Sequence, residues 1–245
     1  MEERSVFKEK NFTANLLQAL IDDDDDKVDD LLRRSDVKTW INNRVKLNEL
    51  KSHNITQEGL KCGEQVDEIE EFETVLGYVC TYKSRECLAK VLKAGADVCV
   101  RSAYGNTCLH RICLSKEQSY EKYEFLSYNL STEVFKTLTT TKNSHNYQPI
   151  HYAAFSGMEK VLEHLIKVQK CDVNVTGRYK RTALHCAVVS GHLQCVKLLI
   201  ECDANIELKD EHQNRALHIA SFCGYTKCVE LLLNSKAETE ARGAN

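Results

Sequence analysis

The feature that most constrains the fold is a period of 33 residues in the second half of the chain. The segment TALHCAVVSG at 182–191 returns as RALHIASFCG at 215–224. Leu184 and Leu217 hold the same place in the two copies, and so do the histidine, alanine and glycine that follow them. A unit of this length cannot bury its apolar face alone, so neighbouring units must stack. The period therefore predicts an elongated array rather than a globule around one core.

The repeat extends well towards the N-terminus. Strong copies begin at 149, 182 and 215, and weaker ones are TCLHRIC at 107–113 and VLGYVC at 75–80. The spacing from His110 to His151 leaves about eight extra residues, which we expect between the two helices of that unit, around Glu117–Leu130. A degenerate copy of the repeat is recognisable in LLQALIDDDDDKVDDLL at 16–32. We count six units.

A T-P-L-H-x-A-like core at this period resembles the ankyrin-repeat family. The resemblance implies an all-α ankyrin-repeat solenoid of about six helix-turn-helix units with β-hairpin loops, and one insertion after the first unit. Residues 1–37 would be a degenerate capping repeat. Residues 38–73 would be a polar insertion with a short helix near Gln65–Phe72. Residues 74–245 would be an array of about five units whose last member has no cap.

The clusters of histidine, cysteine and aspartate have structural explanations. His110, His151, His185 and His218 each fall on the motif histidine, which in the family joins loop and helix start by hydrogen bonds. Cys87, Cys195 and Cys228 share one position of the second helix, where cysteine behaves as a small hydrophobe. No CxxC pair with zinc spacing is present. The run Asp22–Asp26 lacks calcium-loop spacing and is expected to be a solvated turn. We expect no catalytic residues, no metal and no cofactor.

Charge and hydropathy indicate neither a nucleic-acid partner nor a membrane span. Residues 1–74 hold 19 acidic and 11 basic side chains, and residues 75–245 hold 17 and 22. The basic residues are scattered, so no nucleic-acid partner is indicated. No apolar run is long enough to cross a membrane, and the N-terminus does not read as a signal peptide. With 12 cysteines expected to be reduced thiols, we expect the cytoplasm or the nucleus.

The resemblance also implies where a partner would bind. In the family, loop tips and the exposed residues of the first helix form a concave binding face, and tyrosine, phenylalanine and arginine dominate such contacts. Carried over unit by unit, the predicted contact residues are Tyr104, Asn106, His145, Tyr147, Phe155, Arg178, Tyr179, Arg181, Val189, Glu211, His212, Asn214 and Phe222. The alternative is that some of the aromatic residues anchor their loops against the next unit. Asn174, in an Asp-Val-Asn loop after a leucine-containing helix, matches the family's asparagine hydroxylation pattern; a plain loop asparagine is the alternative.

The leading hypothesis is a non-enzymatic intracellular scaffold that binds a partner protein along its concave face. Two alternatives stay open: the cytosolic ankyrin segment of a larger channel or signalling protein, and an ankyrin-type inhibitor of a transcription factor. Leu231, Leu232 and Leu233 have no following unit to cover them. These uncovered leucines indicate that the chain is a fragment, that it is the N-terminal part of a longer protein, or that it self-associates through its C-terminal unit.

Overall fold

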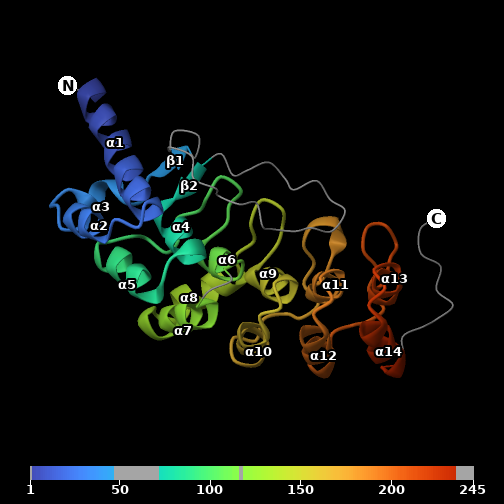
Figure 1. Cartoon of the computed structure of the whole chain (residues 1–245). Helices are drawn as coiled ribbons and strands as arrows, with labels where there is room; N and C mark the ends of the chain where they lie inside the picture. The colour runs from blue at the N-terminus through green and yellow to red at the C-terminus, as the bar shows by residue number, and fades with distance from the viewer. Residues whose placement is uncertain (1, 47–71, 116–117, 236–245) are drawn as a thin grey trace. The chain divides into compact units, whose positions relative to one another are not determined.

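The computed structural model describes residues 2–46, 72–115 and 118–235, and they are predominantly helical (Figure 1). The chain divides into two compact units, Met1–Leu126 and Ser127–Asn245, and each is described by itself. Helix α7 runs across the boundary between them.

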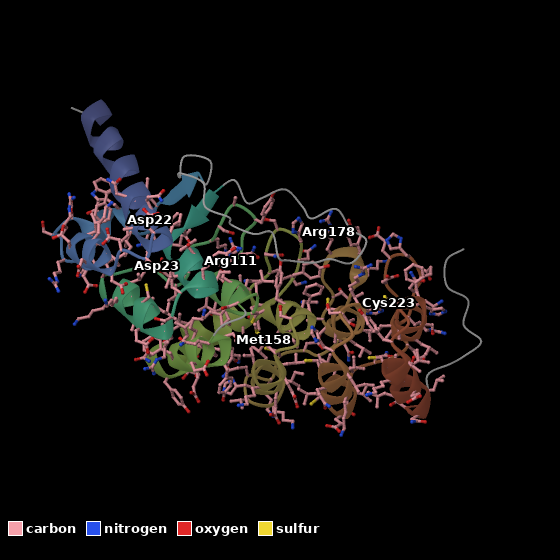
Figure 2. All side chains as sticks on the ribbon, viewed as in Figure 1. Asp22, Asp23, Arg111, Met158, Arg178 and Cys223 are labelled. Carbon is pink, nitrogen blue, oxygen red and sulfur yellow. The ribbon has the colours of Figure 1, made fainter. Side chains whose placement is uncertain are left out.

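Several helices in the N-terminal unit begin where a short polar side chain caps them. The Asp24 carboxylate accepts a hydrogen bond from Lys27 N at the start of α2. Asp22, Asp23 and Asp24 form the turn between α1 and α2, where Figure 2 labels Asp22 and Asp23, and Asp25 and Asp26 lie in the first turn of α2. Thr74 caps α4 in the same way. The elements are α1 (Glu2–Ile21), α2 (Asp25–Leu32), α3 (Val37–Trp40), β1 (Arg44–Lys46), β2 (Phe72–Thr74), α4 (Val75–Tyr82), α5 (Arg85–Lys93), α6 (Cys108–Ile112) and α7 (Ser119–Asn129).

Two short strands bracket residues 47–71. β1 and β2 pair antiparallel, with Arg44 opposite Thr74 and Lys46 opposite Phe72. The chain therefore leaves and re-enters the described part at one place, directly before α4. The helix expected near Gln65–Phe72 falls mainly on residues 65–71, outside the described residues.

Helix α7 occupies the stretch where extra residues were expected, and it carries a fully buried lysine. The Lys122 ammonium donates hydrogen bonds to Cys80 O at 2.7 Å, to Lys83 O at 3.1 Å and to Ser115 Oγ at 2.8 Å. Cys80 lies in the last turn of α4, where backbone carbonyls lack helical donors. Lys122 therefore closes the C-terminal end of α4 from a neighbouring element.

Helices in the C-terminal unit stack in two rows. Helices α9, α11 and α13 contact one another in that order, and α10, α12 and α14 form the second row (Figure 1). Ala153, Ala187 and Ala220 are fully buried in the first row, where small side chains let helices approach closely. The elements are α8 (Thr132–Thr140), α9 (Pro149–Phe155), α10 (Glu159–Lys167), the 3-10 turn η2 (Arg178–Lys180), α11 (Ala183–Val189), α12 (Leu193–Glu201), α13 (Ala216–Phe222) and α14 (Thr226–Asn234).

Each unit of this stack contacts the next through small positions as well as apolar ones. Gly191 has φ +71°, and a Cβ there would lie 2.7 Å from the ring of Tyr225 in the following unit. At the last described helix, Leu232 is fully buried while Leu233 is 41% exposed. Within the described residues, no helix is both long and apolar enough to cross a membrane.

Candidate functional site

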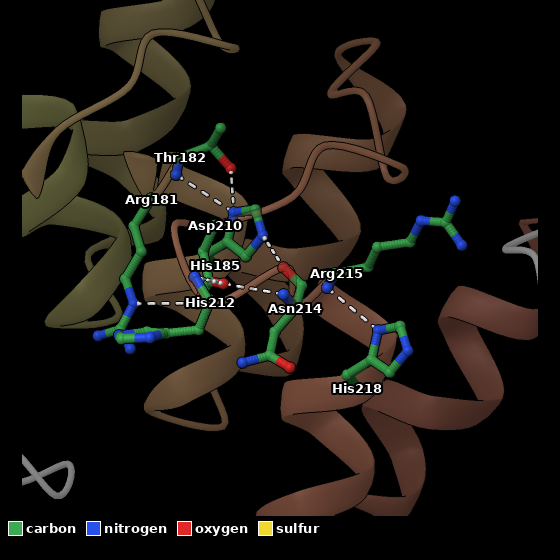
Figure 3. Close-up of polar contacts among 8 residues, drawn as sticks. All are labelled: Arg181, Thr182, His185, Asp210, His212, Asn214, Arg215 and His218. Atoms are coloured by element: carbon green, nitrogen blue, oxygen red, sulfur yellow. Dashed lines mark hydrogen bonds and ion pairs between the residues drawn. The ribbon is translucent and has the colours of Figure 1, made fainter. Parts of the chain in front are cut away.

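The loops that precede α9 and α13 are closed by a polar side chain at their first residue. Asp210 Oδ1 accepts hydrogen bonds from His212 N and Asn214 N, both at 2.9 Å (Figure 3). Asn143 Oδ1 makes the same pair of bonds with His145 N and Tyr147 N, both at 3.0 Å. In a tight turn, the side-chain oxygen of an Asp or Asn can accept the hydrogen bonds of nearby backbone N–H groups that have no other backbone partner. Hydrogen bonds within each loop therefore fix its shape.

The motif histidines join each loop to the unit before it. His185 Nδ1 accepts a hydrogen bond from Thr182 N at 3.2 Å, and its Nε2 donates to Asn214 O at 3.3 Å in the next loop (Figure 3). His151 repeats this arrangement with Gln148 N and Val175 O. His110 and His218 accept the same local bond, from Thr107 N and Arg215 N. The expectation that these histidines tie loop to helix start is confirmed.

Burial keeps two of these rings neutral. It lowers the pKa of His151 from 6.5 to about 4, and it lowers the pKa of His185, where the Asp210 carboxylate acts in the opposite direction. A ring whose two nitrogens are both engaged by the backbone cannot also serve as a base or a metal ligand. His151 and His185 are therefore structural features of the stack.

The loop before α11 differs from the other two. Its first residue is Gly177, and a Cβ there would lie 2.2 Å from Cδ1 of Tyr147. The loop is closed by the backbone alone, with Gly177 N donating to Arg181 O at 2.8 Å. Tyr179 and Lys180 both have φ +57°, a conformation that costs a non-glycine residue about 1–3 kcal/mol. Glu211 N donates to Tyr179 O at 2.7 Å, which joins this tip to the next one.

Aromatic and basic side chains gather where these two tips meet. The Arg178 guanidinium carbon lies 4.7 Å from the Tyr179 ring centroid, and the Tyr179 and His212 ring centroids are 5.9 Å apart. Arg181 Nε lies 3.7 Å from Asp210 Oδ2, an ion-pair distance too long for a hydrogen bond. The Arg181 side chain is only 17% exposed and the Asp210 side chain is fully buried. Arg178, at the tip, is labelled in Figure 2.

The predicted contact residues fall into three groups by solvent exposure: exposed, half-buried and buried. Phe222 is 93% exposed, and Glu211 and His212 are exposed. A second group is half-buried: Tyr104, His145, Phe155, Arg178, Tyr179, Arg181 and Asn214. Arg178, Tyr179, Arg181, Glu211, His212 and Asn214 come together at the two joined tips.

Three predicted contact residues, Asn106, Tyr147 and Val189, are buried and therefore belong to the alternative in which some of the set pack against their own or a neighbouring unit. The Tyr147 ring lies over Gly177 and contacts the rings of His151 and Tyr152. Asn106 is buried in its own loop, where its backbone N–H donates to Ser102 Oγ. Val189 is buried in α11, which has a helix on each side. Loop position alone did not reveal how closely the neighbouring unit covers these side chains.

Sequence reasoning also missed the residue that begins each loop. Ser102, Asn143, Gly177 and Asp210 each stand four residues before the end of their loop. In each case the first residue's N–H donates to the carbonyl of the residue four positions later. A polar or glycine residue at a fixed place before each motif was available as a signal.

Asn174 and the cysteines occupy structural positions as well. Asn174 is half-buried, and its Oδ1 accepts a hydrogen bond from Asn205 N at 2.8 Å in the following loop. Burial raises the pKa of Cys195 to about 12 and that of Cys87 to about 11. In the part of the chain that the structure describes, no group of three or more His, Cys, Asp or Glu residues is arranged to hold a metal ion.

Known proteins share the repeat pattern of this region. Residues 150–242 match the family model for ankyrin repeats in three copies. The chain is 24% identical over 158 residues to the ankyrin repeat protein OPG189 of variola virus, a match that covers 61% of this chain and 27% of that protein. It is 39% identical over 57 residues to inversin of Gallus gallus, covering 23% and 5%. The chain thus spans about a quarter or less of the length of these relatives. Its residues 150–242 are ankyrin repeats, and the chain is homologous to ankyrin-repeat proteins.

Proposed function

We propose that this chain is a non-enzymatic scaffold that binds a partner protein on its concave ankyrin face, through the loop tips before α11 and α13. Ankyrin repeats are in general protein-interaction modules, and the family is generally non-enzymatic. The observation that carries the finer proposal is the joined pair of tips. There, Tyr179 lies between an arginine and a histidine on backbone that is fixed before any partner arrives.

Two physical arguments support this position. Tyrosine and arginine supply most of the energy of protein interfaces, because they combine a large apolar area with directed hydrogen bonds. A loop already held by its own hydrogen bonds loses little conformational entropy on binding. Both conditions hold at Arg178 and Tyr179.

The experiment is affinity capture with the full chain and a tip variant in parallel. Arg178→Ala combined with Tyr179→Asn removes both anchors, and asparagine tolerates the left-handed backbone at that site. Partners identified by mass spectrometry should be lost, with about 2–4 kcal/mol of binding energy removed in total. Lys197→Ala with Lys227→Ala is the control, because both lysines are exposed on the second row of helices. Equal capture by wild type and a folded tip variant would contradict the proposal.

The number of repeat units and the domain boundaries form part of the same proposal. We propose six units with a capping repeat at 1–37, an insertion at 38–73 and an array over 74–245, in a protein of the cytoplasm or nucleus. The paired ends of β1 and β2 support an insertion at that point. Self-association through the C-terminal unit is supported by the 93% exposure of Phe222.

We also propose that Asn174 is a hydroxylation site. Its half-buried amide bridges to the next loop, so a modified side chain would act on the contact between two units. Mass spectrometry of the chain co-expressed with an asparaginyl hydroxylase tests this. Absence of the added oxygen at Asn174 would dismiss it.

A further inference from the structure

We propose that one face of the last described repeat pairs with the same face of a second copy of this chain about a two-fold axis. In that pair, the Phe222 ring of each copy covers Gly224 of the other. This inference rests on the self-association in the proposed function and adds its residues and its symmetry. It does not depend on the loop tips before α11 and α13.

Burial at equivalent positions of two consecutive repeats defines this face. Helices α11 and α12 have a described helix on both sides, whereas α13 and α14 have one on a single side (Figure 1). Val188 and Val189 are buried, but their equivalents Ser221 and Phe222 are exposed, Phe222 by 93%. Cover at these positions therefore comes from the following unit of the stack. We call the end face the five positions of α13 and α14 that lose cover in this way: Leu217, Ser221, Phe222, Val229 and Leu231.

A glycine beside the end face lacks the ring that covers its equivalents. A Cβ at Gly157 would lie 2.6 Å from the His192 ring, and a Cβ at Gly191 would lie 2.7 Å from the Tyr225 ring, each ring belonging to the following unit. A Cβ at Gly224 would have no atom of the described residues within 4 Å. The stack thus repeats a pairing of one glycine with one ring, and Gly224 offers an open place for such a ring.

Phe222 of a second copy is the ring that fits this place. It is the most exposed large apolar side chain among the described residues, whereas Tyr225 already covers Gly191 in its own copy. Phe222 and Gly224 both lie on the side that a following unit covers in the preceding repeat. A two-fold axis therefore lets each copy supply one ring and accept one, which is the self-complementarity of an isologous dimer.

The end face carries no charge that would repel a second copy. Its five positions hold leucine, valine, phenylalanine and serine, and the Ser221 hydroxyl already donates to Leu217 O at 2.9 Å. In a two-fold contact, a charged group near the axis meets its own symmetry mate, and this repulsion opposes association. A neutral face whose polar group is hydrogen-bonded avoids both that repulsion and a desolvation penalty.

Two other parts of the chain supply no such ring. Residues 236–245 have the sequence KAETEARGAN, which contains no aromatic residue and no leucine, isoleucine or valine. At the start of α2, the position equivalent to Tyr225 is Asp24, whose carboxylate caps that helix. A head-to-tail contact with the first repeat of a second copy would therefore place a carboxylate against Gly224 in place of a ring.

Sedimentation velocity of the full chain over a range of concentrations tests the proposal. Wild type should pass from a species of 28.0 kDa to one of twice that mass, with little dependence on salt because no charges hold the contact. Phe222→Ser should raise the dissociation constant at least about tenfold. Tyr128→Ser is the matched control: it removes another ring that is 80% exposed, and it should change the constant less than about twofold.

A second variant tests whether the contact is reciprocal. Gly224→Asn suits the left-handed backbone at this residue, with φ +73°, and places a side chain where the ring of the second copy would lie. It should also raise the dissociation constant at least about tenfold. Mixed with Phe222→Ser, it should form a heterodimer more readily than either variant forms a homodimer, because the mixed pair keeps one ring on one unmodified glycine. Urea unfolding should show that both variants remain folded.

Several results would overturn the inference. A wild-type chain that stays monomeric at its highest soluble concentration would remove the dimer, and equal dimerisation of wild type and Phe222→Ser would move the contact to another surface. A mixture of the two variants that dimerises no better than each alone would exclude the reciprocal pair. Loss of a captured protein from Phe222→Ser, with wild type monomeric, would assign the end face to a different partner. If wild type is monomeric while captured partners still depend on Arg178 and Tyr179, binding at the tips stands and the dimer fails.

Discussion

Replacing Lys122 by methionine should destabilise the N-terminal unit by about 3 kcal/mol. The Lys122 side chain is fully buried, and its ammonium donates to two backbone carbonyls and one hydroxyl at 2.7–3.1 Å. Methionine has a similar length and volume, so the variant opens little cavity. The change therefore isolates the three hydrogen bonds from the packing.

The magnitude follows from two opposing terms. Each buried acceptor that loses its donor costs about 1–3 kcal/mol. Cys80 O and Lys83 O lie at the C-terminal end of α4, where no following N–H of the helix is available to donate to them. Removing the ammonium also avoids its desolvation cost of several kcal/mol. Three unsatisfied acceptors at about 2 kcal/mol each exceed an avoided desolvation cost of about 3 kcal/mol, which leaves a net loss of about 3 kcal/mol.

Trp40 provides the assay, because it is the single tryptophan and lies in α3 of the N-terminal unit. Its fluorescence during urea unfolding should show a midpoint lowered by about 1.5 M. Lys93→Met, at an exposed lysine of α5, is the matched control and should change stability by less than about 0.5 kcal/mol. Equal midpoints for Lys122→Met and wild type would refute the argument that this ammonium stabilises α4.

Three further predictions concern the C-terminal unit. Gly177→Ala should cost about 1–3 kcal/mol because its Cβ would displace the Tyr147 ring, and much less in a Tyr147→Ala background; additive free energies of unfolding in that double-mutant cycle would contradict this. Cys195→Val should stay within about 1.5 kcal/mol of wild type while Cys195→Asp loses several, and a tolerated aspartate in urea unfolding would show that the site is not packed. Because His151 is neutral in the folded chain, its contribution to the free energy of unfolding should be fully present above pH 6.5. As the pH falls to about 4, the unfolded chain binds a proton at this ring that the folded chain does not bind. The free energy of unfolding should therefore fall by up to about 3 kcal/mol over that range. An NMR titration of the ring with a midpoint near 6.5 would overturn that assignment.

The repeat period was sufficient to predict the helices of residues 150–234, and the ankyrin resemblance that it carries implied the role of their histidines. Both depend on local spacing that a single chain displays, since His151 and His185 bond to backbone within their own motif and in the following loop. The accessibility of loop residues could not be predicted in the same way. Tyr147 is covered because residue 177 is a glycine, thirty positions later, so its exposure depends on a residue in another unit.

The N-terminal unit was harder to predict for a different reason. Lys122 reads as a surface residue of a polar helix, and its burial depends on carbonyl groups at the end of α4 that no side-chain pattern reveals. The strands β1 and β2 have three residues each, too few for a periodic signal.

The pairing of β1 with β2 also bears on how much chain this protein can accommodate between Lys46 and Phe72. Because those two residues are already partners across the hairpin, the ends of the connecting segment meet whatever its length. The entropy of closing a flexible loop grows only with the logarithm of its length, so each doubling of an inserted flexible sequence costs about 0.6 kcal/mol. A foreign sequence or a small reporter domain inserted at this point should therefore leave the helices on either side, α3 and α4, undisturbed.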